Sequence, residues 1–339
     1  MRFSFTADQR LLAGAVREVL AGTSPPDAVR AAAADPSARR GAAWHALARV
    51  GLLGALVAEE HGGLGLTPLD TVLAFEETGR FAVPGPLVES AVAAPWLVEP
   101  GWLAKIAAGT AAVSVAMPHL LDADVVDLLV MRSGGGVRAV SPDDVTLSPI
   151  PSLDATRRLF AASAADAGRA EGDPLGGSPA VFGSAADHAA LATAAQLVGL
   201  GRRLLEMTVA YAGQRRQFGT AIGSFQAVKH QLADVAIALD FAAPVVYRAA
   251  YALTHRTPSA PRDVSAAKIA AGTAAHRAAR AALQVHGAIG YTEELDLHLW
   301  LTRVWSLRGA WGEESLHRAR LRDALLGEPA PPRLPQGVR

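Results

Sequence analysis

The sequence contains no cysteine among its 339 residues. The absence of cysteine excludes disulfide bonds, iron–sulfur clusters, thiolate zinc sites and a cysteine nucleophile. An excess charge of either sign is also absent, because 32 Lys and Arg residues balance 32 Asp and Glu residues. Without a basic excess, the chain has no positive field for holding nucleic acid through its phosphates. The balance leaves little mutual repulsion, so we expect the chain to associate with other protein surfaces.

Long hydrophobic runs are missing as well, although 50% of the residues are hydrophobic. The first residues lead directly into polar ones, without the apolar centre of a secretion signal. The longest apolar stretches, such as residues 189–201, contain Gln196 and are shorter than the ~18 residues that a membrane span needs. We therefore expect a cytoplasmic protein without a membrane span.

Motifs for metal or serine catalysis are equally absent. The ten histidines form no HExxH pattern, and His286, His298 and His317 are too widely spaced to indicate a metal cluster. No GxSxG element is present for a Ser–His–Asp triad.

Residues 1–110 show the pattern of a helical domain. Thr6 with Gln9 forms a capping box ahead of apolar residues at helical spacing. Thr67, followed by Pro68 and Asp70, predicts a second helix start, and that helix is expected to end near Gly79.

Residues 111–182 change to short apolar runs separated by Gly, Pro, Asp and Ser, which predicts a small, shortened β-domain. The turn between two of its strands is expected at residues 133–136, and residues 151–158 are expected to lead into an edge strand. The predicted strands are residues 112–117, 126–131, 137–140, 145–150 and 158–162.

Residues 183–328 return to long helical patterns rich in alanine, which indicates close packing in a bundle. Ser184 with Asp187 is expected to cap a helix that ends at about residues 213–216. Further helices are predicted over residues 226–251, with a kink at Pro244, and over 263–286. Residues 329–339 form a proline-rich tail. The predicted fold class is mainly α with a small β insertion.

The segment from Tyr211 to Gly219 combines two arginines with a glycine stop. One interpretation is that Arg215 and Arg216 complement the dipole at a helix C-terminus, with Gly219 as the cap. The other is that an arginine is presented there to bind an anion such as a pyrophosphate. A second segment, residues 284–294, has small residues at 287, 288 and 290 that allow close approach of a ligand or a helix.

Taken together, three segments resemble the acyl-CoA dehydrogenase family. Residues 51–65 with 76–80 resemble its N-terminal signature, and Arg215–Gly219 with Phe225-Gln226 resembles its RxxFG…FQ motif. Residues 284–292, followed by 297–301, resemble its QxxGGxGY segment. The resemblance implies an N-terminal helical domain, a middle β-domain and a C-terminal four-helix bundle. It also implies FAD, oxidation of an acyl-CoA thioester to the 2-enoyl-CoA in a dimer or tetramer, and an electron-transfer flavoprotein or similar acceptor.

The resemblance assigns cofactor-binding roles to positions near the two motifs. Arg215 matches the pyrophosphate ligand and Gln226 a position on the adenosine side, while Ala288 replaces the second glycine of the usual pair. In the family each flavin spans a subunit interface, so these residues are expected to serve a flavin held mainly by a partner. The matching positions are Arg215, Phe218, Gln226, Gln284, Gly287 and Ala288.

The catalytic base of the family has no counterpart at its usual positions. Trp311 stands where the resemblance places the usual glutamate, and the alternative position falls near Ala189. Glu313 is a candidate for a displaced base, with Glu314 beside it, but such a pair is also typical of a helix N-terminus. Two residues near the alternative position also have structural interpretations. Asp187 is part of the predicted capping box, and His188 is typical of a surface or packing histidine.

The predicted β-domain, residues 111–182, also departs from the family pattern. The loop and the tryptophan-containing strand that hold the flavin ring have no match in residues 116–124. The resulting hypothesis is a short, degenerate subunit similar to those of actinobacterial α2β2 enzymes, in which a homologous full-length subunit supplies the base. The alternatives are a homomeric enzyme that uses Glu313 and a non-catalytic assembly subunit. A flavin monooxygenase is disfavoured, because nothing indicates an oxygen-reactive site.

Overall fold

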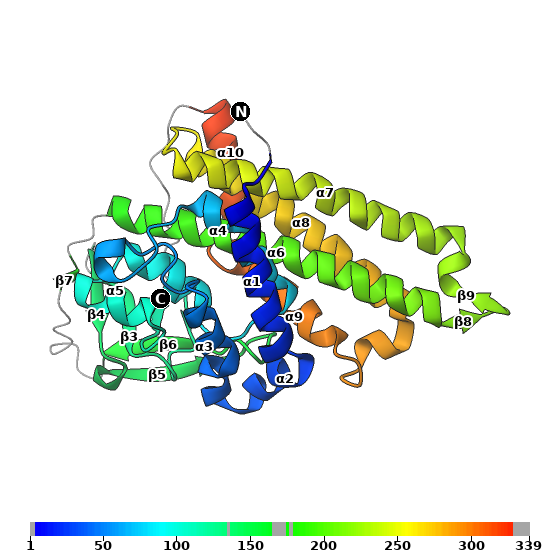
Figure 1. Cartoon of the computed structure of the whole chain (residues 1–339), viewed down its shortest axis with the longest axis horizontal. Helices are drawn as coiled ribbons and strands as arrows, with labels where there is room; N and C mark the ends of the chain where they lie inside the picture. Colours follow the sequence, from blue (N-terminus) through cyan, green and yellow to red (C-terminus); the bar gives the residue numbers. More distant parts are fainter. Residues whose placement is uncertain (1–3, 134–135, 165–173, 176–178, 328–339) are drawn as a thin grey trace.

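A computed structural model describes residues 4–133, 136–164, 174–175 and 179–327. A helical N-terminal part, a region of short strands and a bundle of long helices follow one another along the chain (Figure 1). This order confirms the expected fold class. The long helices α6 (Pro179–Gln214), α7 (Gln226–Thr254) and α8 (Ala260–His286) extend beyond the rest of the molecule as an arm that ends in a small hairpin (Figure 1).

The N-terminal helices begin where their sequences predict. α1 (Ala7–Thr23) starts after Thr6, whose hydroxyl accepts from the Gln9 backbone N–H at 3.2 Å while the Gln9 side chain accepts from the Thr6 N–H. α4 (Pro68–Arg80) begins after Thr67, where the Asp70 carboxylate accepts from the Thr67 backbone N–H at 2.9 Å and from the Thr67 hydroxyl at 2.6 Å. The predicted capping box at Thr6 and the predicted helix start at Thr67 are confirmed. The remaining elements are α2 (Pro26–Ala34), η1 (Pro36–Arg40), α3 (Ala42–Arg49), η2 (Glu59–His61), η3 (Glu89–Ala93), η4 (Ala94–Trp96) and α5 (Pro100–Ala107).

Two glycines allow α4 to cross α6 (Pro179–Gln214) at very short range. A Cβ atom at Gly79 would lie 2.0 Å from the Gln196 carbonyl oxygen, and one at Gly199 would lie 1.9 Å from the Glu76 carbonyl oxygen. Any side chain at either position would force the helices apart. Gly79 therefore serves the crossing, and α4 continues to Arg80.

The middle region holds two small sheets. In one, β1 (Val113–Val115) pairs in parallel with β3 (Leu128–Ser133), and β3 pairs antiparallel with β4 (Gly136–Val140), with Ser133 opposite Gly136. The turn residues between β3 and β4 lie outside the described part. In the other, β6 lies between β2 and β5, so the strand expected at an edge is central. The elements are β1 (Val113–Val115), β2 (Leu120–Leu121), β3 (Leu128–Ser133), β4 (Gly136–Val140), η5 (Pro142–Asp144), β5 (Val145–Ile150), β6 (Leu159–Ala164) and β7 (Pro174–Leu175).

The C-terminal helices form the bundle. α6 begins at Pro179, so the predicted cap at Ser184 is wrong: Ser184 lies inside the helix and its hydroxyl donates to the Ala180 carbonyl. The predicted proline-rich tail lies outside the described residues. The other elements are β8 (Arg216–Gln217), β9 (Thr220–Ala221), η6 (Ile222–Ser224), α7 (Gln226–Thr254), α8 (Ala260–His286), η7 (Gly287–Tyr291), α9 (Leu297–Gly309) and α10 (Glu314–Leu326).

Among the described helices, α7 alone is long and apolar enough to cross a membrane by length and composition. Its Val235, Leu239, Val246 and Ala250 are buried against the bundle. Such a pattern is also that of a core helix in a water-soluble protein. The helix continues through Pro244.

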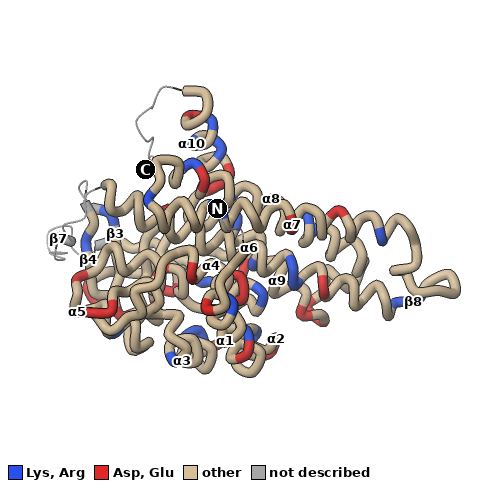
Figure 2. The backbone as a smooth tube through the Cα atoms, turned by 45° about the horizontal axis from the view of Figure 1, so that its top comes forward, with Lys and Arg blue, Asp and Glu red and all other residues tan. Residues whose placement is uncertain are grey.

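Charges of both signs are interspersed over the backbone of the described residues (Figure 2). This distribution agrees with the balanced composition of the chain.

Candidate functional site

The predicted cofactor residues gather at the far end of the arm. α6 ends at Gln214, and the Arg215 backbone N–H donates to the Tyr211 carbonyl at 2.8 Å. The Tyr211 ring stacks on the His286 ring at the end of α8, with centroids 4.2 Å apart. Because this contact joins the C-terminal ends of α6 and α8, Arg215 lies at the same end of the arm as the Gln284–Ala288 segment.

A hairpin that the sequence did not predict shapes the Arg215 segment. β8 and β9 pair antiparallel, and the Ile222 N–H donates to the Arg215 carbonyl at 2.8 Å. Phe218 and Gly219 form the turn with positive φ angles of 52° and 79°. Gly219 is therefore a hairpin residue, not the helix cap that one interpretation expected. Phe218 is 92% exposed, and its ring lies edge-to-face with the Phe225 ring at 6.2 Å between centroids.

Arg215 and Gln226 both face solvent in this chain. Within the described residues, the Arg215 guanidinium has no carboxylate partner, so its charge is available to an external anion. Gln226 is the first residue of α7, directly after the hairpin. The hairpin thus presents both predicted cofactor residues outward.

The turn after α8 is equally open. Gly287 has φ +65° and ψ −141°, a conformation that glycine adopts far more readily than other residues, and a Cβ there would meet nothing within 4 Å. Ala288 is exposed, so its methyl group crowds nothing within this chain. The open space fits the close approach of a ligand that the resemblance implies.

Trp311, at the position where the resemblance places the usual base, has a buried, fixed side chain. It is 4% exposed and has φ +56°, an uncommon conformation for a bulky residue. Its carbonyl accepts from His317 Nε2 at 3.2 Å. Burial, and then the nearby Lys268 charge, lower the pKa of His317 to about 4. The turn between α9 and α10 is therefore held by buried polar contacts.

Glu89 is a buried carboxylate beside Trp311 that the sequence reasoning missed. The Trp311 side chain donates a hydrogen bond to it, and Glu89 Oε2 has no partner among the described residues. Burial raises the pKa of Glu89, against the opposing effect of the Arg157 charge. The only available signal was a single acid within the apolar run of residues 87–97.

The position near Ala189, where the resemblance places the alternative base, is apolar. Ala189 is fully buried on α6, and its neighbour Asp187 pairs with Arg320 on α10 at 2.8 Å. His188 Nδ1 donates to the Ser184 carbonyl at 2.8 Å, and its ring lies 4.5 Å from that of Trp96. Both neighbours therefore have structural partners. The adjoining crevice between α4 and α6 has a volume of about 10 Å³, enough for about one water molecule.

Glu313 and Glu314 lie at the start of α10. Glu313 is the exposed residue that precedes the first helical turn. Glu314 pairs with Arg308 at 3.0 Å and with Arg318, and the hydrogen bond from Arg318 is the main cause that lowers the pKa of Glu314. The geometry places both carboxylates where they stabilise the helix N-terminus.

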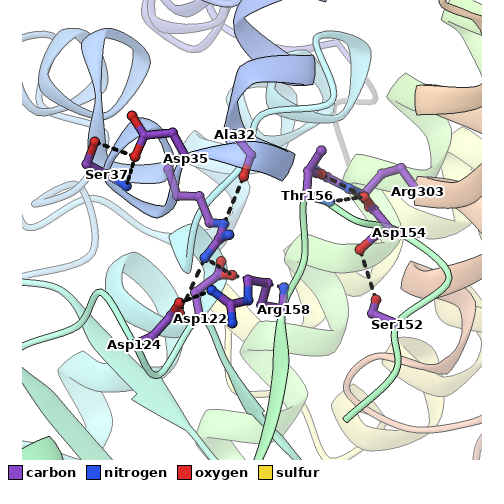
Figure 3. A network of polar contacts seen from close by, with 11 residues as sticks. Ala32, Asp35, Ser37, Asp122, Asp124, Ser152, Asp154, Thr156, Arg158 and Arg303 are labelled. Carbon is purple, nitrogen blue, oxygen red and sulfur yellow. Dashed lines mark hydrogen bonds and ion pairs between the residues drawn. The ribbon is translucent and has the colours of Figure 1, made fainter. Parts of the chain in front are cut away.

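A network of buried ions fixes the middle region (Figure 3). Arg303 on α9 donates to Asp154 and Thr156, and also to the Val83 carbonyl at 2.7 Å. These contacts join the bundle to the strand region and to the N-terminal helices.

The second half of this network joins the N-terminal helices to the strands. Arg39 lies 3.5 Å from Asp122 and 3.3 Å from Asp124, which also pairs with Arg158. Burial raises the pKa of Asp122 to about 7, although the Arg39 charge opposes it. These ion pairs and hydrogen bonds thus hold the three parts of the chain together.

Comparison with known proteins gives two family matches. Residues 6–109 match the acyl-CoA dehydrogenase N-terminal domain, and residues 179–326 match the acyl-CoA dehydrogenase C-terminal domain. The chain is 33% identical over 305 residues to acyl-CoA dehydrogenase IpdE2 of Mycobacterium tuberculosis, covering 88% of this chain and 91% of that protein.

Solved structures share the fold. A structure of the ChsE4-ChsE5 complex from Mycobacterium tuberculosis matches with a TM-score of 0.80 and 24% identity, over 97% of this chain and 100% of that chain. The Tcur3481-Tcur3483 steroid ACAD G363A variant matches with a TM-score of 0.84 and 23% identity, over 93% and 96% of the two chains. The chain belongs to the acyl-CoA dehydrogenase family.

Proposed function

We propose that this chain is the base-lacking subunit of a heteromeric, FAD-dependent acyl-CoA dehydrogenase. The observation that carries the proposal is the burial of Trp311 and Ala189, the residues at the two positions where the resemblance places a base. Removal of the α-proton requires a basic group within reach of the substrate, so a homologous full-length subunit supplies that carboxylate.

The residues at the end of the arm fit one side of a flavin site. FAD, the cofactor of the family, accepts the hydride from the β-carbon of the thioester when bound. Arg215 would hold its pyrophosphate as an unpaired cation, and Gly287 would let the backbone approach it. Gln284 and Gln226 add amide groups that can hydrogen-bond to the nucleotide. All four positions lie at or near the surface, which suits a cofactor shared with a second subunit.

Exposed apolar side chains on the arm support association with such a subunit. Phe241 and Ile237, one helical turn apart on α7, are 76% and 54% exposed, and Phe218 protrudes beside Arg215. Large exposed apolar groups of this kind are typical of interaction surfaces. The similarity to IpdE2 and to a chain of the ChsE4-ChsE5 complex points in the same direction.

The remaining parts of the proposal follow from the family. The substrate is an acyl-CoA thioester, desaturated between its α and β carbons, and the electrons leave to an electron-transfer flavoprotein or a similar acceptor. We place the complex in the cytoplasm. The similarity to a steroid ACAD structure favours lipid or steroid degradation as the setting.

The test is co-expression with the neighbouring reading frame, followed by counting flavins per subunit in the purified complex. About one flavin per pair of chains is expected from the proposal. One flavin per chain in a purified homomer would contradict it.

The homomeric alternative with Glu313 as base receives no support from its exposed position at the start of α10. Glu313→Gln in the complex is therefore expected to leave turnover unchanged. Loss of turnover with retained flavin would favour that alternative.

A further inference from the structure

Arg157 is a cation without a partner in the middle region of the chain. Its backbone is fixed, because its N–H donates to the Asp154 carbonyl at 2.9 Å and the next residue, Arg158, donates its N–H to Asp122 at 3.0 Å. Arg157 itself is partly exposed. Within the described residues, no hydrogen bond or ion pair engages its guanidinium group.

Two of the three acids whose charges act on Arg157 are matched by other arginines. These ion pairs are Arg303–Asp154 and Arg39–Asp122. The third acid, Glu89, has the strongest charge effect on Arg157, although the two groups do not form an ion pair. A gap therefore separates the Arg157 guanidinium from the Glu89 carboxyl group.

The Glu89 carboxyl group supplies a buried polar atom at the other side of this gap. Glu89 is 4% exposed, and its Oε2 atom has no hydrogen-bond partner among the described residues. The Trp311 side chain donates to the same carboxyl group. Burial raises the pKa of Glu89 and so favours the neutral acid, which can donate one hydrogen bond through its O–H.

The charge of Arg157 is poorly hydrated. Burial is the main cause that lowers the pKa of Arg157, and the charge of Arg303 also lowers it. An uncompensated cation that is withdrawn from water is costly, and a bound anion that accepts its hydrogen bonds reduces that cost. Because Glu89 favours its neutral form, the described residues leave this counter-charge to a ligand.

We propose that the gap between Arg157 and Glu89 binds the carboxylate group of a small ligand. One carboxylate oxygen accepts from the Arg157 guanidinium, and the other accepts from the Glu89 O–H beside Trp311. A single negative charge matches the single unpaired cation, whereas a phosphate dianion would exceed it. The inference goes beyond the proposed function, because the predicted cofactor residues lie at the far end of the arm and Arg157 lies in the middle region (Figure 1).

The test is titration of the purified full chain with sodium acetate at pH 7, with ionic strength held constant by sodium chloride. Tryptophan fluorescence is the readout, because Trp311 bonds to Glu89. Wild type is expected to respond saturably, and Arg157→Gln is expected to bind at least about tenfold more weakly, since a charged hydrogen bond is lost. Arg10→Gln, which removes an exposed arginine on α1, is the matched control and should bind as wild type does.

Further variants separate a binding role from a structural one. Arg157→Lys should recover part of the affinity, because lysine keeps the charge but not the planar fork. Trp311→Phe should lose the fluorescence response, and circular dichroism verifies that each variant is folded. Equal acetate affinity of wild type and Arg157→Gln, no saturable response, or an unchanged response in Trp311→Phe would overturn the inference.

Two thioesters of equal acyl length identify the source of the carboxylate. If it belongs to an acyl chain, glutaryl-CoA should compete with acetate in wild type and pentanoyl-CoA should not. If it belongs to a free acid, glutarate should compete and neither thioester should. Competition by pentanoyl-CoA equal to that of glutaryl-CoA would contradict carboxylate recognition.

The outcome is independent of the proposed function. The titration requires neither flavin nor a partner subunit, so a heteromer with the expected flavin content could coexist with unchanged acetate binding in Arg157→Gln. That result would reject the carboxylate site and retain the subunit proposal. Arginine-dependent acetate binding by a chain that forms a one-flavin-per-chain homomer would do the reverse.

Discussion

The ammonium group of Lys268 lies 2.9 Å from the carbonyl oxygen of Arg308 and 3.0 Å from that of Leu307. These carbonyls belong to the last turn of α9, where helical hydrogen bonds run out. Lys268 also reaches the Gly312 carbonyl at 3.4 Å. A single buried lysine therefore holds the turn that carries Trp311.

Lys268→Met is expected to destabilise the chain by about 2–4 kcal/mol, because buried carbonyls lose their donor. Burial lowers the pKa of Lys268 to about 7, far below that of an unfolded lysine. Between pH 7 and about 10, Lys268 is protonated in the unfolded chain but neutral in the folded chain. The free energy of unfolding of the wild type therefore rises with pH over this range. Urea denaturation from pH 6 to 9 should show a smaller rise in the variant. Lys229→Met, at an exposed position, should retain the wild-type slope.

Asp122→Asn is expected to reduce the pH dependence of the free energy of unfolding between pH 4 and 7. The raised pKa of about 7 means that the folded chain holds a proton between pH 4 and 7 that the unfolded chain releases. Stability contributed by Asp122 therefore falls as pH rises, by up to about 1.4 kcal/mol per pH unit. Asparagine tolerates the φ of +51° at this position. A slope equal to wild type between pH 4 and 7 would refute the assignment; exposed Asp143→Asn is the control.

Gly287→Ala tests the conformation of the turn after α8. The backbone there is unfavourable for a residue with a Cβ, although the space is open, so we expect a loss of about 1–3 kcal/mol. Gly213→Ala, in equally open space within α6, should instead be neutral or stabilising by up to about 1 kcal/mol. Urea denaturation of both variants measures the contrast. Equal effects would show that the Gly287 conformation carries no cost.

Arg215→Ala is expected to reduce the FAD affinity of the co-expressed complex by roughly ten- to a hundredfold, because a charged hydrogen bond to phosphate is lost. Arg215→Lys should lose less, since it retains the charge. Flavin absorbance per complex after dialysis gives the readout. Unchanged flavin retention in Arg215→Ala would favour the assembly-only alternative.

Local sequence signals predicted much of the fold. The capping box at Thr6 and the helix start at Thr67 appear as expected, because both signals depend on residues within three positions of each other. The predicted cap at Ser184 was wrong, because a serine hydroxyl can also donate to the carbonyl four residues earlier within a helix, as Ser184 does to Ala180. The central place of β6 depends on its pairing with β2 and β5, which local sequence does not contain.

The residues of the candidate site were predicted only where a local motif marks them, because contacts between distant segments are not contained in the local sequence. The prediction that Trp311 and Ala189 stand at the base positions came from the motif spacing alone. Glu89 could not be predicted, because it is separated from Trp311 by more than 200 residues and meets it only in the folded chain.

The most direct test of the central claim is acyl-CoA-dependent dye reduction by the purified chain alone and by its co-expressed complex. Acyl-CoA substrates of several chain types and a steroid side-chain thioester should be compared at equal protein concentration. The account predicts turnover by the complex and none by the isolated chain. Robust turnover by the isolated chain would contradict it.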